Sequence, residues 1–370
     1  MKVSFPHMGY SYLAFKWMVE HTGHECIVPP EPSKRTLDLG VRHSPEFACI
    51  PFKMLMGTYL EVAEMGAEMI ITSGSNGPCR AGLYWVMHQY LLEELGQPVK
   101  IVALEPPLCD MRDFIGKLRL IRKTGGISTK QLIWVLQVTW EKVKAIDEIE
   151  RHSHEIRPYE IGKGDTTRAF WQALEMIDAA NSINEVRLAY REALKVLDAV
   201  PQDNSRNPLK VGIIGEIYVV LEPSANHYMQ IMLGEMGVQT DRSIYLSGYT
   251  KKTTIYDLEG DLYTVAQPYL NEAPIGGHGA NSIAETVLYS RHGYDGVVQL
   301  APFSCIPEIV AKSILPTVSR DHDIPVLTLF IDEQTGKAGV QTRLEAFVDL
   351  MERRREVKQK QSTIARRLVI

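Results

Sequence analysis

The stretch EMIITSGSNGPCRAGLYWVMHQYLLEELGQPVKIVAL, residues 68–104, decides the fold. It contains an apolar run at residues 68–72, a helical pattern over residues 81–95 and a second apolar run at residues 99–104. Short apolar runs separated by a helix of this length predict two parallel strands that are buried on both faces. The loop after the first strand holds Cys79, directly after a Gly-Pro pair.

The same alternation extends in both directions along the chain. Strands near residues 2–5 and 26–28 and helices over residues 12–21 and 52–65 complete an N-terminal α/β domain, residues 1–124, with a doubly wound parallel sheet. Residues 125–208 show helical spacing without strand signals, and they end in a turn-rich linker from Pro201 to Pro208. We expect a helical insert and linker there.

A strand at residues 210–215 begins a second α/β domain, residues 209–350, with further strands near residues 297–300 and 326–331. Within it, Thr342 and Glu345 match a capping box, which predicts a helix that starts at Thr342. Residues 351–370 form a basic tail, interpreted as a solvated helical extension.

Composition limits the class of protein. The chain of 370 residues is 45% hydrophobic and 23% charged with a formal net charge of −5, which is ordinary globular material. Neither a signal-peptide pattern nor a run of 18 apolar residues occurs, so we expect a soluble, cytoplasmic protein without a nucleic-acid or membrane partner. Five cysteines at long spacings favour reduced thiols or metal ligands over disulfides.

Three cysteines share one local context. Cys49, Cys79 and Cys305 each lie in a loop that opens a predicted helix, with a proline one or two residues away. A helix N-terminus favours thiolate and should lower the thiol pKa, so these three residues are the candidate ligands of one metal or iron–sulfur site. The alternative is that each thiol only packs in the core, as we expect for Cys26 inside a strand. Cys109, in another loop before a helix, is a possible fourth ligand.

Other residues carry weaker signals. Three thiolates leave one position open, as a catalytic centre requires, whereas three cysteines with His278 would make a closed zinc site. His278 lies in a glycine turn and either enters the cleft or bonds only nearby backbone. Glu216 follows a strand end and is either a general acid or base or a loop ligand. The chain lacks a Walker A sequence, so we expect no ATP hydrolysis by it alone.

Several runs together resemble the superfamily of 2-hydroxyacyl-CoA dehydratases and benzoyl-CoA reductases, and within it the branch of activase-related, dehydratase-like proteins (CoA protein activases). They are Ser44 to Lys53, Gly77-Pro78-Cys79-Arg80, Gly276-Gly277-His278-Gly279, Pro302 to Glu308, Asp332 to Gly336 and Thr342 to Phe347.

This resemblance implies two Rossmann-like domains and a 4Fe-4S cluster held by Cys49, Cys79 and Cys305. It also implies a separate ATP-hydrolysing iron–sulfur activase as electron donor, with a homologous subunit or second copy as a possible partner. A related branch carries a larger double-cubane cluster on about twice as many cysteines, which five do not readily supply.

The predicted function is an iron–sulfur reductase or dehydratase-like component that passes low-potential electrons to a small substrate, with His278 and Glu216 as catalytic candidates. The alternative is a non-catalytic iron–sulfur carrier or accessory protein. No run is typical of a CoA site, so the substrate class stays open.

Overall fold

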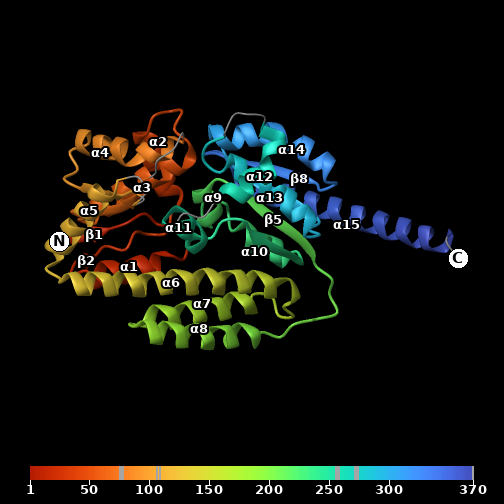
Figure 1. Cartoon of the computed structure of the whole chain (residues 1–370), viewed down its shortest axis with the longest axis horizontal. Coiled ribbons are helices and arrows are strands. Elements are labelled where there is room, and N and C mark those ends of the chain that lie inside the picture. The colour runs from red at the N-terminus through yellow and green to blue at the C-terminus, as the bar shows by residue number, and fades with distance from the viewer. Residues whose placement is uncertain (75–78, 106, 108–109, 255–258, 271–274, 369–370) are drawn as a thin grey trace.

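Two four-stranded parallel sheets organise the computed structural model, which describes residues 1–74, 79–105, 107, 110–254, 259–270 and 275–368 (Figure 1). The first sheet has the order β2-β1-β3-β4, and the second has the order β6-β5-β7-β8. This confirms the predicted α/β class with parallel sheets. The strands are β1 (Lys2–Ser4), β2 (Glu25–Cys26), β3 (Met69–Ser73), β4 (Lys100–Leu104), β5 (Leu209–Gly215), β6 (Val238–Arg242), β7 (Gly296–Pro302) and β8 (Val326–Ile331).

Helices cover both faces of the first sheet. In β3, Met69 and Ile71 pack with residues of α1 and α5, whereas Ile70 points to the opposite face and packs with α3 and α4. This alternation follows from the two-residue period of a strand, and it explains why the whole run is apolar. The helices are α1 (Tyr12–His21), α2 (Lys34–His43), α3 (Ile50–Glu64), the 3-10 turn η1 (Arg80–Leu83), α4 (Tyr84–Glu94) and α5 (Met111–Gly125).

The second sheet is covered in the same way. Ile213 and Leu300 pack toward α9, α10 and α15, while Ile214 and Val297 pack toward α13 and α14. The helices of this part are α9 (Ile217–Leu221), α10 (Met229–Glu235), α11 (Leu246–Thr254), α12 (Glu259–Leu270), α13 (Gly279–Arg291), α14 (Ile306–Asp321) and α15 (Lys337–Leu368).

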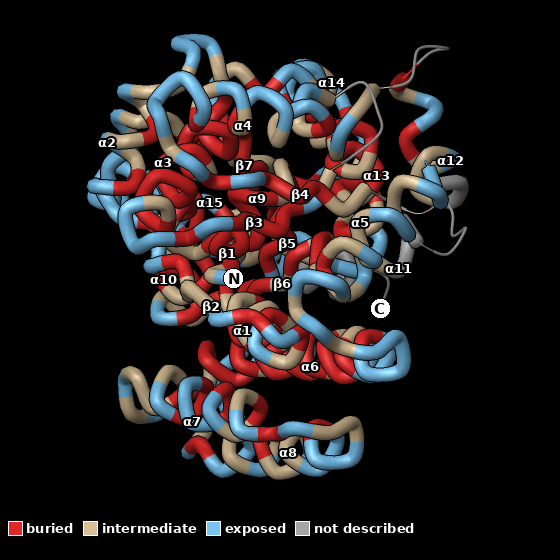
Figure 2. The backbone as a smooth tube through the Cα atoms, turned by 90° about the vertical axis from the view of Figure 1, so that its left-hand side faces the viewer, coloured by how far each residue is buried: buried red, intermediate tan, exposed pale blue. Residues whose placement is uncertain are grey.

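A helical layer joins the two sheets in sequence. It consists of α6 (Thr129–Ile156), the turn η2 (Arg157–Tyr159), α7 (Asp165–Ala179) and α8 (Ile183–Asp198), and its apolar faces pack together and against α1 (Figure 2). Helix α6 also contacts β6, where the guanidinium of Arg242 donates two hydrogen bonds of 2.6 Å to the buried carboxylate of Glu150. This pair ties the helical layer to the second sheet.

Helix α15 corrects one prediction. It begins at Lys337, so Thr342 lies inside the helix, where its hydroxyl donates to the carbonyl of Ala338 at 3.1 Å. The predicted helix start at Thr342 is therefore wrong, because a capping-box pattern also fits the interior of a helix that has begun one turn earlier.

The basic tail continues α15 without a break and projects from the body (Figure 1). Its first basic residues are held by the second sheet's loops, since Arg354 pairs with Asp323 at 2.5 Å and Arg355 pairs with Asp295 at 2.5 Å. The tail is thus a helical extension anchored by ion pairs at its base.

Helix α3 lies in both cores and positions the site. Ile50 and Met54 pack in the core of the second sheet, while Met56 and Tyr59 pack in that of the first. The strand order reverses between β1 and β3 and again between β5 and β7. Ligands of open parallel sheets bind beyond the carboxyl ends of strands at such reversals.

Candidate functional site

Each of the three predicted cysteines is the N-cap residue of a helical segment. Cys49 precedes α3, Cys79 precedes η1 and Cys305 precedes α14. Cys79 follows β3 and Cys305 follows β7, the strands next to the order reversal in each sheet. The predicted local context of all three residues is confirmed.

Arg80 ties the three cysteine loops together. Its guanidinium donates to the carbonyl of Phe47 at 3.2 Å and to the carbonyl of Ser304 at 2.7 Å. The Ser304 hydroxyl donates to the same Phe47 carbonyl at 3.1 Å. Because Phe47, Arg80 and Ser304 are each within two residues of a cysteine, these bonds bring segments that are up to 257 residues apart to one place.

The predicted low thiol pKa is wrong. Burial raises the pKa of Cys49, Cys79 and Cys305 above the usual range, and it outweighs a hydrogen bond that each thiol receives from a backbone N–H of its own helix start. The helix effect is present, but desolvation of the charged form dominates. The metal-free thiols are therefore protonated at neutral pH, and a bound metal would have to displace those protons.

Glu216 lies near all three cysteines. It is the N-cap of α9, and its carboxylate accepts a hydrogen bond of 3.0 Å from the N–H of Val219. Its charge acts on all three thiols and raises the pKa of each. Burial in turn raises the pKa of Glu216 to about 7. The structure thus brings this predicted residue together with the cysteines, and a carboxyl group with a pKa near neutrality is suited to proton transfer.

A second carboxyl group, Glu308, was not predicted. It is fully buried in the first turn of α14 and accepts hydrogen bonds from Ser282 at 3.0 Å and from the Gln299 side chain at 2.8 Å. Burial raises its pKa to about 7, and the charge of Glu216 adds to that rise. Its place three residues after Cys305 was the available signal, but an acidic residue there is also common in ordinary helix starts.

Two further contacts stabilise the loop of Cys49. The hydroxyl of Tyr84 is hydrogen-bonded to the Cys49 thiol, and the two rings of Phe52 and Tyr84 meet edge to face. The buried ammonium of Lys53 donates to the carbonyl of Glu46 at 3.0 Å and to the carboxylate of Glu333 at 3.1 Å. Glu333 follows β8, so Lys53 joins the Cys49 loop to the second sheet.

His278 is the second of the two predicted catalytic residues. It is the N-cap of α13, and its ring lies 5.6 Å from the ring of Tyr249. The backbone just before it approaches the cysteines closely: a Cβ atom built on Gly277, whose φ is +58°, would lie 3.7 Å from the Cβ of Cys79 and 2.9 Å from Pro307. Its predicted catalytic role stays a prediction.

The other two cysteines differ in outcome. Cys26 is partly buried at the end of β2 and packs beside the apolar core of the first sheet, where burial raises its pKa to about 12. It takes no part in the site. Cys109 lies outside the described residues.

Within the described ranges, no three His, Cys, Asp or Glu side chains are grouped closely enough to hold one metal ion. A cubane cluster makes a different demand, because its thiolates bind different irons at separate corners and so stand farther apart than the ligands of a single ion. The residues present are of the kind that a cubane requires. Three thiols lie on three loops that are hydrogen-bonded to one another, and each thiol accepts a hydrogen bond from a backbone N–H.

Large apolar side chains are exposed beside each cysteine. Phe47, Leu83, Phe303 and Ile306 are 74%, 70%, 58% and 60% exposed. Apolar side chains are therefore exposed close to all three cysteine loops.

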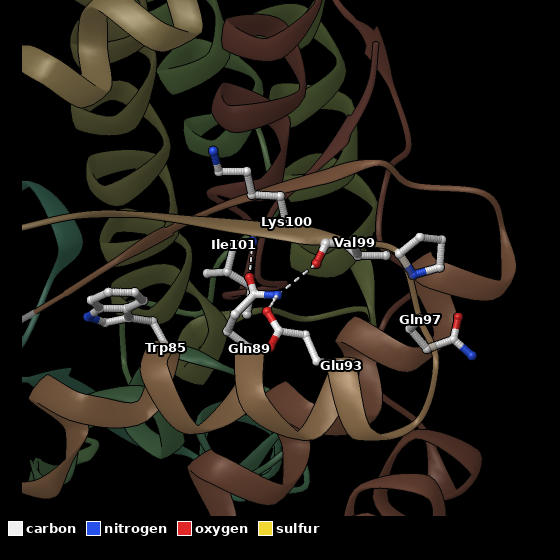
Figure 3. A pocket seen from close by; sticks show the side chains of 8 residues that line it. Trp85, Gln89, Glu93, Gln97, Val99, Lys100 and Ile101 are labelled. Carbon is white, nitrogen blue, oxygen red and sulfur yellow. Dashed lines mark hydrogen bonds between the residues drawn. The ribbon is translucent and has the colours of Figure 1, made fainter.

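Figure 3 shows a hollow elsewhere, about 500 Å³ in volume, between α4 and β4. The side-chain amide of Gln89 accepts from the N–H of Ile101 at 2.7 Å and donates to the carbonyl of Val99 at 3.2 Å, so it satisfies the free edge of β4. None of the predicted site residues lines this hollow.

None of the described helices combines the length and apolarity that a membrane span requires. No protein-family model matches this chain, and its sequence has no significant match among curated proteins.

Proposed function

We propose that this chain is an iron–sulfur reductase or dehydratase-like component, in which Cys49, Cys79 and Cys305 hold a 4Fe-4S cluster. The observation that carries the proposal is the Arg80 clamp, which joins the loops of Cys79 and Cys305, after strands of different sheets, to the loop of Cys49 before α3. A core-packing role for each thiol separately would not require their loops to be hydrogen-bonded to one another. When bound, such a cluster supplies low-potential electrons and one iron with an open position.

The chain's own residues support a reaction that needs protons as well as electrons. Glu216 and Glu308 both have a pKa of about 7, so each can hold or release a proton near neutral pH. Glu216 is the better candidate for contact with substrate, because Glu308 is fully enclosed and bonded to Ser282 and Gln299. His278, one residue from the glycine beside Cys79, is proposed as a second proton-transfer residue.

The fold and the partners are proposed in the same terms. Two Rossmann-like halves, with order reversals at β1/β3 and β5/β7, would place the cluster between their carboxyl edges. The exposed apolar residues around the cysteines fit the docking of an ATP-hydrolysing iron–sulfur activase or of a homologous subunit. We also propose a cytoplasmic location, where thiols stay reduced.

A second candidate is a carrier or accessory protein that binds a cluster without transforming a substrate. The exposure of Phe47, Leu83, Phe303 and Ile306 favours it, because a cluster in such a position is open to protein partners. Added small anions or substrate analogues separate the two candidates: a changed magnetic resonance signal of the reduced cluster supports the enzyme, and an unchanged signal supports the carrier.

Anaerobic purification tests the cofactor. We expect brown protein with about four irons and matching sulfide per chain. Cys49→Ala, Cys79→Ala and Cys305→Ala should each lose the cluster, while the matched control Cys26→Ala should retain it because Cys26 lies at the end of β2, outside the site. Colourless protein with stoichiometric zinc, or full iron content in all three variants, would show that the proposal is wrong.

A further inference from the structure

Arg80 uses its charge in an unusual way for an exposed residue. Among the described residues no carboxylate pairs with it, and its two terminal nitrogens donate instead to the carbonyls of Phe47 and Ser304. Exposed arginines more often stay solvated or meet acidic side chains, and a surface contact of that kind contributes little. A planar guanidinium is suited to fixing two acceptors at once, since its donors form a rigid fork.

The backbone that Arg80 contacts includes a strained residue. Ser304 has a φ of +62°, a left-handed conformation that is rare outside glycine, and its carbonyl is the acceptor of the shorter Arg80 bond. The hydroxyl of the same residue bonds Phe47. A strained residue of this kind persists only where its surroundings hold it, and Arg80 is one of the groups that do so.

Arg80 also has an electrostatic effect at the same place. Its guanidinium lies against the carbonyls of Phe47 and Ser304, so its positive charge stands within two residues of each of the three proposed ligands. A cation beside a cluster stabilises the more negative, reduced state, and so raises the midpoint potential.

We infer that Arg80 is a positioning residue that holds the three cysteine loops in the arrangement that accepts a cluster, and that its charge sets part of the cluster's midpoint potential. This inference rests on the proposed function, and it assigns two separable roles to one side chain. The fork geometry governs how well the cluster is retained, and the charge governs the potential.

Three variants separate these roles after anaerobic reconstitution. Arg80→Met removes both, so it should lose cluster faster than the unaltered protein on anaerobic gel filtration and lower the midpoint potential. The reduction equilibrium should change by up to about tenfold, which is about 59 mV for a one-electron couple. Arg80→Lys keeps the charge without the fork, so it should keep the potential but lose cluster faster. Ser304→Ala removes one neutral tie, and it should weaken retention at an unchanged potential.

The control is Arg187→Met, which removes an exposed arginine that pairs with Glu141 within the helical layer formed by α6, α7 and α8. It should match the unaltered protein in iron content and in a potentiometric titration followed by magnetic resonance. Equal retention and equal potential in Arg80→Met and the control would overturn the inference while leaving the cluster assignment intact. Failure of the unaltered protein to bind any iron–sulfur cluster would instead overturn the proposed function.

Far-ultraviolet circular dichroism on each variant checks that the fold is retained. Ser304→Ala keeps the positioning role testable if Arg80→Met unfolds.

Discussion

Glu216→Gln should stabilise the metal-free protein above neutral pH while removing a group that the proposed reaction needs. Burial raises the carboxyl pKa from 4.5 to about 7 in the folded state. The folded protein therefore binds more protons than the unfolded chain between these values, and the free energy of unfolding falls as pH rises through that window. Below pH 4.5 the carboxyl is protonated in both the folded and the unfolded state, so its burial does not lower the free energy of unfolding there.

The magnitude follows from the width of the window. A difference of one pKa unit corresponds to about 1.36 kcal/mol, so the full cost above pH 7 is about 3 kcal/mol. Glutamine keeps an oxygen that can accept from the N–H of Val219 but does not ionise. Glu216→Gln should therefore have nearly the unfolding free energy of the unaltered protein at pH 4.5 and exceed it by up to about 3 kcal/mol at pH 8.

Urea unfolding of both proteins, prepared without iron, at half-unit steps from pH 4.5 to 8 measures this difference. The gap between the two curves should open between pH 4.5 and 7 and stay constant above. Parallel curves over the whole range would refute the reasoning, since they would mean that Glu216 ionises in the folded protein as easily as in water. A substitution that stabilises the fold at Glu216 is expected if this carboxyl group serves function at a cost in stability.

The remaining predictions concern other parts of the molecule. Glu150→Gln should lower the free energy of unfolding by about 3–5 kcal/mol, because it leaves the buried guanidinium of Arg242 without its charged partner. The double variant Glu150→Met, Arg242→Met should lose less free energy of unfolding than Glu150→Gln, and urea unfolding measures both. The purified chain should show no ATPase activity, and its cluster should reach the fully reduced state only when an activase and ATP are added, as optical spectra would report. His278→Ala should abolish substrate turnover at unchanged iron content, and turnover equal to the unaltered protein would remove His278 from the reaction.

The local pattern of the chain was enough to predict seven of the eight strands that the structure describes, while β6 was missed. The helix over residues 12–21 and the strand over residues 326–331 have the predicted bounds, and β3 and β4 differ by one residue. These segments combine a clear apolar period with flanking turn residues, so local preference and tertiary packing agree. The start of α15 was missed because Thr342 carries a capping signal that the continuous helix overrides.

The site was predictable only in part, for a physical reason. The placement of Cys49, Cys79 and Cys305 before helices is a local property, and a sequence pattern can show it. Their pKa depends on how deeply the folded chain buries them, which no local pattern contains. The contacts of Arg80 with Phe47 and of Lys53 with Glu333 likewise link residues 33 and 280 positions apart, so they follow from tertiary structure alone.

The electrostatic balance of the site explains how thiols with raised pKa values can belong to the proposed cluster site. Three thiols and two carboxyl groups share one buried region, and the pKa of every one of them is raised. Without metal, the region therefore stays neutral by keeping its protons, because several negative charges in a desolvated space would repel one another. If Cys49, Cys79 and Cys305 hold an iron–sulfur cluster as proposed, its cationic iron core would reverse this balance, because the cysteines would bind it as thiolates and give up their protons. Binding of the cluster should accordingly strengthen as pH rises and stabilise the fold in proportion, which couples assembly of the site to the joining of the two sheets.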